Sequence, residues 1–394
     1  MRIAFFGNTN NYPLPLVLEL RERGYKVDLY CDKSDDLHNP VNRDSSLENS
    51  DWIFNVSTLF KFGYSFFLPT LSRLKFYKKL KSYDFIFYNG MPTIIAWLIR
   101  VDYGVLITGS DLDVYGNLAS LKLFSIKFLK ENGLKLFIRQ YFLYFIILSM
   151  RNSIRNAKFF NYFKKGFLPH GDKILDEINP KSKIRTSFMI GNNKSIKYTP
   201  ILDSSSNKLK VFCGARLNWV RPLKNNLTEL DYKDVDKLLY GIKLFKERSN
   251  ISISLCLVKK GVDIDETVAL VKELALENEV IWFEEMSQSE LYKQFIMSDV
   301  IVDQLGASAM GMVGVDALCF GRPVLTNIQE IESEAPSKDL PICVASNAEE
   351  VCHQLIRLQD LEYRKKIGEY SRLYADKNYS PQSIIDYYLS IIEG

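Results

Sequence analysis

A loop that contains three glycines, between a strand-like run and a helical run, has the residue types that bind phosphate. The strand-like run ends at Val302, and the helical run that follows the loop carries Asp316. Free backbone N–H groups at a helix N-terminus, reached through a loop without bulky side chains, can hold a diphosphate. The residues expected to supply these groups are Gly311, Met312, Val313 and Gly314.

Asp316 lies close to this expected anion site. A carboxylate repels phosphate, but its oxygens can accept two hydrogen bonds from the hydroxyls of a ribose. An acid near a helix N-terminus also interacts favourably with the helix dipole without binding any ligand. The residues of the loop by themselves favour neither interpretation over the other.

Cysteine and histidine are too scattered to suggest a zinc site or a disulfide framework. The six cysteines form no Cys-x-x-Cys pair, and the three histidines are far apart in the sequence. Two Asp-x-Asp strings, at residues 111–113 and 263–265, have side chains that bind divalent cations, but such short strings are common by chance. We expect no metal ion and no other cofactor, and cysteines that stay reduced in a cytoplasm.

The second half of the sequence alternates strand-like and helical runs, which predicts a doubly wound α/β domain with a parallel sheet. The strand-like runs are at residues 210–213, 251–257, 280–283, 300–302 and 323–326, and the helical runs are at residues 235–245, 265–276, 288–296 and 314–320. The glycine-containing loop follows the fourth of these strands. Ligands of such sheets bind at the carboxyl ends of the strands.

The first half begins with the same alternation. A strand at residues 3–6 is followed by a polar loop from Gly7, by a helix, and by a strand at residues 27–30. Further buried strands are expected at residues 85–88 and 104–107. This spacing of strand, loop, helix and strand predicts a second parallel sheet.

Length and composition favour two domains. The chain has 394 residues, of which 47% are hydrophobic, so each half can bury its own core. A serine-rich break at residues 203–208 separates the two series of strands. We expect Rossmann-like domains over residues 1–195 and 205–377, and a last helix, at about residues 378–394, that packs back on the first domain. Two such domains commonly have a ligand-binding cleft between them.

Residues 314–325, Gly-Val-Asp-Ala-Leu-Cys-Phe-Gly-Arg-Pro-Val-Leu, resemble the donor-binding signature of retaining GT-B glycosyltransferases of family four, also called group 1. That signature has two glutamates eight positions apart, and the turn at residues 321–323 belongs to it. By resemblance, Asp316 stands for the second glutamate and holds the ribose of a nucleotide. Ser308 stands for the first, which lies near the transferred sugar in the family, so the identity of the donor sugar stays open.

Two cations match the same family. Residues 214–217, Gly-Ala-Arg-Leu, resemble its Gly-Arg-Leu, and the run that begins at Lys233 resembles its Lys-Gly-x-Asp-x-Leu-Leu. The resemblance implies that Arg216 and Lys233 act in catalysis by contacting the donor diphosphate, where fixed cations stabilise charge that develops on the leaving group. In the family the two are only a few residues apart, so residues 218–232 are expected to be an insertion.

The resemblance covers roughly residues 205–345 well and the first half only in outline. Residues 107–112, Ile-Thr-Gly-Ser-Asp-Leu, resemble the family's His-Gly-x-Asp-Leu, with threonine in place of the histidine that touches the sugar. We expect Asp111, as a catalytic residue, and Gly7 to lie on the acceptor side of the cleft. The residues also expected within reach of the donor are Gly7, Thr108 and Leu291.

Positive charge is concentrated in the first half. Residues 1–190 hold 27 Lys and Arg against 17 Asp and Glu, and residues 117–165 hold ten cations, one acid and many large apolar residues. A basic amphipathic helix suits the surface of an anionic membrane. A solvated helix face is the alternative, and nucleic acid is disfavoured because no recognition motif accompanies the charge. The cations expected at the membrane are Lys122, Lys127, Lys130, Lys135 and Arg139.

These features predict a glycosyltransferase that moves a sugar from a nucleotide-diphosphate sugar to a glycan or lipid-linked acceptor, as in lipopolysaccharide or capsule assembly. By resemblance it should retain the anomeric configuration and need no metal. The first residues do not look like a secretory signal, and the longest apolar run, residues 141–150, is too short to span a bilayer. We therefore expect a cytoplasmic protein, peripheral on the inner face of the cell membrane. A sugar-nucleotide epimerase of the same fold and a non-catalytic nucleotide-sugar binder are the alternative hypotheses.

Overall fold

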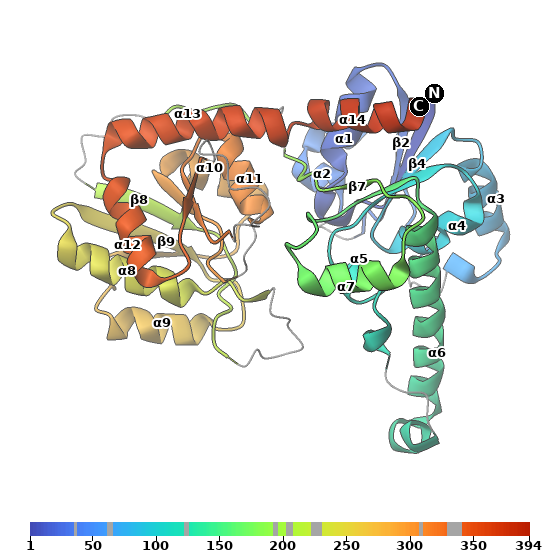
Figure 1. Cartoon of the computed structure of the whole chain (residues 1–394), viewed down its shortest axis with the longest axis horizontal. Coiled ribbons are helices and arrows are strands. Elements are labelled where there is room, and N and C mark those ends of the chain that lie inside the picture. The colour runs from blue at the N-terminus through green and yellow to red at the C-terminus, as the bar shows by residue number, and fades with distance from the viewer. Residues whose placement is uncertain are drawn as a thin grey trace. The chain divides into compact units, whose positions relative to one another are not determined.

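The structure is a computed structural model. It describes residues 1–34, 38–60, 66–121, 126–191, 196–201, 208–221, 231–306, 310–328 and 341–394, without the side chains of Arg43, Ser110, residues 126–133 and Lys135. The chain forms two compact units (Figure 1). The first consists of Met1–Ile190 and Ile384–Gly394, and the second of Gly191–Ser383.

The first unit contains a sheet of seven parallel strands in the order β3-β2-β1-β4-β5-β6-β7. The strands are β1 (Arg2–Phe6), β2 (Lys26–Cys31), β3 (Ile53–Asn55), β4 (Phe85–Asn89), β5 (Tyr103–Leu106), β6 (Phe159–Asn161) and β7 (Arg185–Thr186). The strand order reverses between β1 and β4. At such a switch point the loops on the carboxyl edge diverge, which makes room for a ligand.

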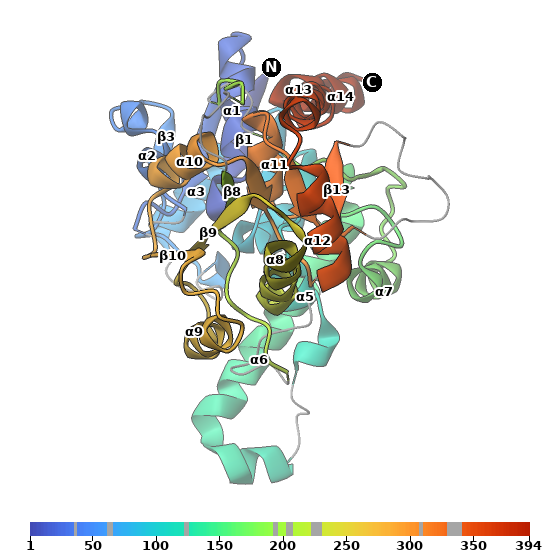
Figure 2. The same ribbon diagram turned by 90° about the vertical axis from the view of Figure 1, so that its left-hand side faces the viewer.

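Helices cover both faces of this sheet (Figures 1 and 2). They are α1 (Leu14–Glu22), α2 (Pro40–Arg43), α3 (Leu71–Leu80), α4 (Ala96–Ile99), α5 (Ser110–Asp113), α6 (Ile126–Asn156), α7 (Pro169–Ile178) and α14 (Pro381–Glu393), with 3-10 turns η1 (Thr9–Asn11), η2 (Ser45–Leu47), η4 (Met91–Ile95) and η5 (Leu118–Ser120). Phe5 of β1 lies in a core that includes Tyr388 of α14. The neighbouring Phe6 points to the opposite face, where its ring meets Phe76 of α3.

Helix α6 extends beyond the rest of its unit (Figures 1 and 2). Its C-terminal part packs against η4 and α4, and Ile147, Met150 and Ile154 are fully buried there. Several of the large apolar side chains between residues 134 and 148 are nevertheless exposed, namely Leu134, Ile138, Tyr141, Phe142, Tyr144, Phe145 and Leu148. Within the described ranges, no helix combines the length and the apolar character needed to cross a membrane.

The second unit contains a sheet of six parallel strands in the order β10-β9-β8-β11-β12-β13. Its elements are β8 (Lys208–Cys213), α8 (Val235–Arg248), β9 (Ser252–Val258), α9 (Ile264–Glu273), β10 (Val280–Phe283), α10 (Gln288–Met297), β11 (Val300–Val302), α11 (Met312–Cys319), β12 (Val324–Thr326), β13 (Ile342–Val344), α12 (Ala348–Arg357) and α13 (Leu361–Asn378). The order reverses between β8 and β11. The doubly wound parallel sheets predicted for both halves are confirmed.

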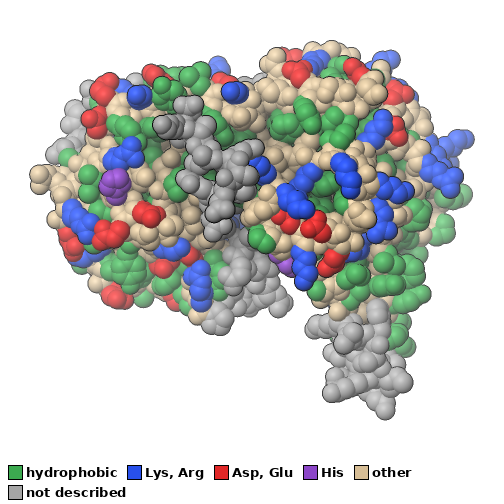
Figure 3. Space-filling model, in the orientation of Figure 1, with side chains coloured by type: hydrophobic (Ala, Val, Ile, Leu, Met, Phe, Trp, Pro, Cys, Tyr) green, Lys and Arg blue, Asp and Glu red, His purple; other side chains and the backbone are tan. Residues whose placement is uncertain are grey.

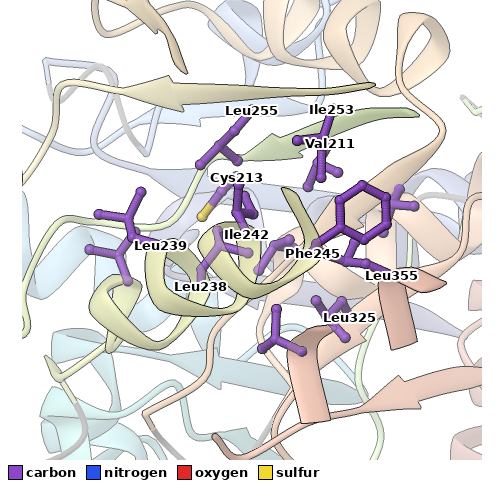
Figure 4. Close-up of a cluster of buried hydrophobic side chains, with 14 of the residues drawn as sticks. Val211, Cys213, Leu238, Leu239, Ile242, Phe245, Ile253, Leu255, Leu325 and Leu355 are labelled. Carbon is purple, nitrogen blue, oxygen red and sulfur yellow. The ribbon is translucent and has the colours of Figure 1, made fainter. Parts of the chain in front are cut away.

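The main core of the second unit lies between its sheet and the helices α8, α9 and α12. Val211 and Cys213 of β8 lie in this core with Ile242 of α8 (Figure 4). The residue between them, Phe212, points to the other face, where its ring meets Phe295 of α10. This alternation fixes which side of the sheet each helix covers, because successive side chains of a strand point in opposite directions.

The turn that follows α11 is fixed by backbone and side-chain hydrogen bonds. Gly321 has a φ of 73°, and the following N–H, that of Arg322, donates back to the carbonyl of Ala317. The Arg322 side chain is 2% exposed. It donates to backbone carbonyls, among them those of Thr199, Phe295 and Ile296. The arginine of residues 321–323 therefore serves the packing of α11.

Replacement of Gly321 by alanine should destabilise the protein more than the same change at Gly24. Both glycines have positive φ, but a Cβ on Gly321 would lie 2.3 Å from the ring of Tyr198 and 3.1 Å from the carbonyl oxygen of Gly368, whereas a Cβ on Gly24 would meet nothing within 4 Å. We expect Gly24→Ala to lower the unfolding free energy by about 1 kcal/mol and Gly321→Ala by about 3 kcal/mol. If chemical denaturation gave the same loss of unfolding free energy for both variants, the contacts of the Cβ at position 321 would make no contribution.

Candidate functional site

The candidate site lies on the carboxyl edge of the second sheet, where the strand order reverses. β8 ends at Cys213 and continues into residues 214–221, and β11 ends at Val302 and continues into Asp303 and Gln304. The two strands are adjacent and parallel. The residues that follow them therefore meet at the same edge of the sheet.

Asn218 connects the two cations that are predicted to bind a diphosphate. Its backbone carbonyl accepts a hydrogen bond from the N–H of Lys233 at 2.8 Å, and its buried side-chain amide donates to the carbonyl of Asp231. Its side-chain oxygen accepts from the N–H of Val262, which follows β9. Arg216 is exposed and lies near enough to Lys233 to lower the pKa of the lysine. The N–H of Asn218 in turn donates to the carbonyl of Arg216 at 2.9 Å, so Asn218 links the backbones of Arg216 and Lys233.

The ammonium group of Lys233 is directed at the residues that follow β11. Its Nζ donates to Oε1 of Gln304, which is buried. Burial lowers the pKa of Lys233, the charges of Asp303 and Asp231 oppose this shift, and the charge of Arg216 adds to it. Two cations held close together repel each other, so an anion bound between them is electrostatically favoured.

Asp303 lies at the N-terminus of α11, where the sequence predicts an anion site. Its buried carboxylate accepts hydrogen bonds from the N–H of Gly311, at 2.5 Å, and from the N–H of Gly314. A Cβ on Gly311 would lie only 3.0 Å from a carboxylate oxygen, so glycine permits the close approach. The N–H groups predicted to hold a diphosphate therefore face a carboxylate of the protein. The two residues between them, Met312 and Val313, are exposed and half-buried.

Burial raises the pKa of Asp303 to about 6. The hydrogen bonds from Gly311 and Gly314 and the charge of Lys233 lower it, but they do not compensate for the loss of solvent around the carboxylate. Asp303 was missed by the sequence analysis, since an acid directly after a buried strand has no distinctive spacing.

Asp316 lies in the second turn of α11 and is buried. Its Oδ2 accepts a hydrogen bond of 2.9 Å from the hydroxyl of Tyr292 on α10. Leu291, the residue before Tyr292, is half-buried, and its side chain lies 3.3 Å from where a Cβ on Gly214 would be. Helix α10 therefore approaches both Asp316 and the loop that carries Arg216. Tyr292 was also missed, although it lies in a stretch that resembles the family.

In the first unit, Gly7 lies at the switch point between β1 and β4. A Cβ at this position would be 1.9 Å from the carbonyl oxygen of Asn89, so only glycine allows the two loops to approach. Asp111 is 2% exposed, and its carboxylate accepts from the N–H groups of Thr108, Gly109 and Leu112. Burial raises the pKa of Asp111, and these hydrogen bonds oppose the shift. The carboxylate thus holds the loop after β5, and Thr108 takes part in the same turn.

Some of the predicted residues, or their side chains, lie outside the part of the chain that the structure describes. Ser308 and Lys122 lie outside the described residues. Lys127, Lys130 and Lys135 lie within α6, where their side chains are not described, and Arg139 is exposed on the same helix.

The described ranges contain no group of three or more His, Cys, Asp or Glu side chains that could hold a metal ion. None of the six cysteines is in a disulfide, and five of them are buried. Burial raises the pKa of the Cys213 and Cys343 thiols to about 12, which makes these two cysteines unreactive.

The variant Asp303→Asn should change how stability depends on pH. The pKa of Asp303 is about 6 in the folded protein against an ordinary value of 3.8, so the folded state binds the proton more tightly than the unfolded state. The stability that this proton confers is present below about pH 4 and is lost as the pH rises through 6. Between these limits the unfolding free energy of the wild type should fall by about 3 kcal/mol relative to that of the variant, as measured by urea denaturation. If the unfolding free energies of the two proteins changed with pH in the same way, the raised pKa would not belong to Asp303.

Comparison with known families gives one match. The family described as Glycosyl transferases group 1 matches residues 228–374, a segment that contains Lys233, Asp303 and Asp316. No curated protein matches the chain.

Solved structures with a similar fold include the following three proteins. HepE of Anabaena, in complex with UDP and glucose, has a TM-score of 0.59 at 13% identity, over 99% of each chain. Sucrose-phosphate synthase from Thermosynechococcus elongatus has a TM-score of 0.59 at 14% identity, over 100% of this chain and 99% of that one. The lipopolysaccharide outer core galactosyltransferase WaaB, in its apo form, has a TM-score of 0.55 at 13% identity, over 100% and 99%.

At these identities the structural likeness establishes the fold alone, and the family match adds the class of enzyme. The chain is a transferase enzyme with the GT-B fold, and its residues 228–374 match the family described as Glycosyl transferases group 1.

Proposed function

We propose that the chain transfers a sugar from a nucleotide-diphosphate sugar to a glycan or lipid-linked acceptor. The observation that carries the proposal is the pair of cations, Arg216 and Lys233, held together on the edge of the sheet by Asn218. Asp316 on the neighbouring α11 supplies a buried carboxylate of the kind that holds a ribose. The crystallisation of HepE with UDP and glucose supports a donor of this class.

The chemistry follows from the charges at this edge. When the bond between sugar and diphosphate breaks, negative charge develops on the leaving diphosphate, and cations fixed beside it lower the barrier. The carboxylate of Asp303 already accepts hydrogen bonds from the N–H groups of Gly311 and Gly314. Stabilisation of the leaving diphosphate would therefore come mostly from Arg216 and Lys233. The two side chains supply the positive charge that a metal ion provides in other transferases, and by resemblance the reaction retains the anomeric configuration.

The proposal for the acceptor rests on the exposed surface of the first unit. Helix α6 carries large exposed apolar side chains, and hydrophobic residues gather over it on the face seen in Figure 3. Trp97 and Leu98 on α4, which packs against α6, are also exposed. An exposed aromatic surface in a basic stretch of sequence suits the interface of an anionic membrane. We therefore propose a peripheral enzyme on the inner face of the cell membrane, with a lipid-linked acceptor such as a lipopolysaccharide precursor.

A thermal-shift screen against a panel of nucleotide-sugars tests the donor half, because a ligand that binds the folded state raises the apparent melting temperature. The nucleotide-sugar that shifts it most is then incubated with the enzyme, alone and with a membrane extract. Transfer that requires the extract supports the proposal. Conversion of the sugar without any acceptor would show an epimerase instead, and binding without either reaction would show a nucleotide-sugar binder.

Arg216→Ala should lower turnover far more than donor binding, because the charge that the arginine stabilises is largest in the transition state. We expect kcat to fall roughly 100-fold and the donor Kd to change by less than about threefold. Arg221→Ala is the matched control, since Arg221 lies on the same loop but pairs with Asp234. Unchanged kinetics in Arg216→Ala would contradict the leaving-group role.

Loss of two aromatic side chains from α6 should weaken membrane binding. Tyr141 and Phe145 are exposed, with ring centroids 4.9 Å apart, so Tyr141→Ser/Phe145→Ser removes a single apolar patch. We expect co-sedimentation with phosphatidylglycerol-containing vesicles to weaken by roughly tenfold. Tyr240→Ser, an exposed tyrosine on α8, is the control and should leave binding unchanged. Equal sedimentation of all three proteins would favour a solvated helix face.

A further inference from the structure

Tyr292 of α10 forms a direct hydrogen bond with Asp316 of α11. The distance from the tyrosine Oη to Oδ2 of the aspartate is 2.9 Å. Gln288, one turn earlier on α10, donates from Nε2 to the same tyrosine Oη at 2.8 Å. The three side chains therefore form a chain of hydrogen bonds that ends on the carboxylate proposed to hold the ribose.

The direction of these bonds follows from the number of protons available. A tyrosine hydroxyl has one proton to donate, and an ionised carboxylate can only accept. The amide of Gln288 donates to the oxygen of Tyr292, so the single hydroxyl proton is free to point at Asp316. This hydrogen bond restrains the orientation of the Asp316 carboxylate.

Packing holds the tyrosine in place. Its ring meets Phe320 at 5.0 Å and 64° and Phe295 at 6.1 Å. Phe320 is the residue that directly follows α11, and its N–H donates to the carbonyl of Asp316, so the two side chains lie on the same side of the helix. The tyrosine thus touches that face twice, with its ring and with its hydroxyl.

The first turn of α10 is itself restrained. Ser287 and Glu290 form a capping box, in which each side chain accepts from the backbone N–H of the other. This box fixes the turn that carries Gln288, and with it the start of the hydrogen-bond chain. Because Phe295 is fully buried against Phe212, the rest of the helix is anchored to the sheet as well.

We propose that Tyr292 is a positioning residue for ribose recognition, which holds the carboxylate of Asp316 in the orientation that accepts the ribose hydroxyls. This inference rests on the proposed role of Asp316 in donor binding. Tyr292 acts through the aspartate, to which it donates its hydroxyl proton. A carboxylate without this hydroxyl would rotate among several orientations, and part of the binding free energy would be lost in ordering it.

Calorimetric titration with UDP, 2′-deoxy-UDP and 3′-deoxy-UDP tests the proposal. The wild type should bind at least one deoxy analogue roughly tenfold more weakly than UDP, because a hydrogen bond to a charged group is lost. Tyr292→Phe keeps the ring contacts but removes the hydroxyl. It should bind UDP roughly tenfold more weakly and lose most of the discrimination between UDP and that analogue.

Two further variants separate positioning from general stability. Tyr379→Phe removes a tyrosine hydroxyl that interacts with Tyr374 in the same unit, and it should leave the discrimination unchanged. In an Asp316→Asn background, Tyr292→Phe should have little further effect on UDP affinity, because the two side chains act as one unit.

Different results would overturn the role of Tyr292 and the role of Asp316. If Tyr292→Phe is folded and keeps the full discrimination of the wild type, Tyr292 has no part in ribose recognition. If the wild type binds UDP and both deoxy analogues equally well, the ribose role of Asp316 is wrong, and the inference drawn from it is overturned as well.

Discussion

The parallel pairing of β8 with β11 is the constraint on which the candidate site depends. The chain builds the sheet outward from β8 to β10 and then returns to place β11 on the other side of β8. The loops after the two strands must therefore diverge, and the edge between them is left open to a ligand. Arg216 and Lys233 lie in the connection after β8, and Asp303 and Gln304 directly follow β11. The same reversal between β1 and β4 explains why Gly7 lies on the corresponding edge of the first unit.

Charge at this edge is balanced between fixed groups. The N-terminus of α11 carries a partial positive charge, and the buried carboxylate of Asp303 neutralises it. The raised pKa of Asp303, about 6, records the cost of this burial. The positive charge that remains for a ligand comes from Arg216 and Lys233, whose mutual repulsion a bound diphosphate would relieve. The phosphate binding that we propose for this unit therefore relies on side chains more than on the helix dipole.

The alternation of apolar and helical runs made the sheets predictable from the sequence. The contacts that organise the site could not be predicted in this way. The runs at residues 280–283 and 300–302 coincide with β10 and β11, because short apolar runs in such an alternation are buried strands. Asn218 and Tyr292 escaped prediction because their roles depend on partners that only the tertiary fold brings close. The turn at residues 321–323 resembled part of a binding signature, yet the Arg322 side chain binds backbone carbonyls. A short motif gives the position of such a residue but not the direction of its side chain.

The most direct test of the account is a crystal structure of the protein with a bound nucleotide-diphosphate sugar. We expect the diphosphate to lie within hydrogen-bond distance of the Arg216 and Lys233 side chains, and the ribose hydroxyls to face the carboxylate of Asp316. Asp303 should keep its hydrogen bond to the N–H of Gly311. A diphosphate bound to the N-terminus of α11, with Asp303 displaced and Arg216 without contact, would contradict the central claim.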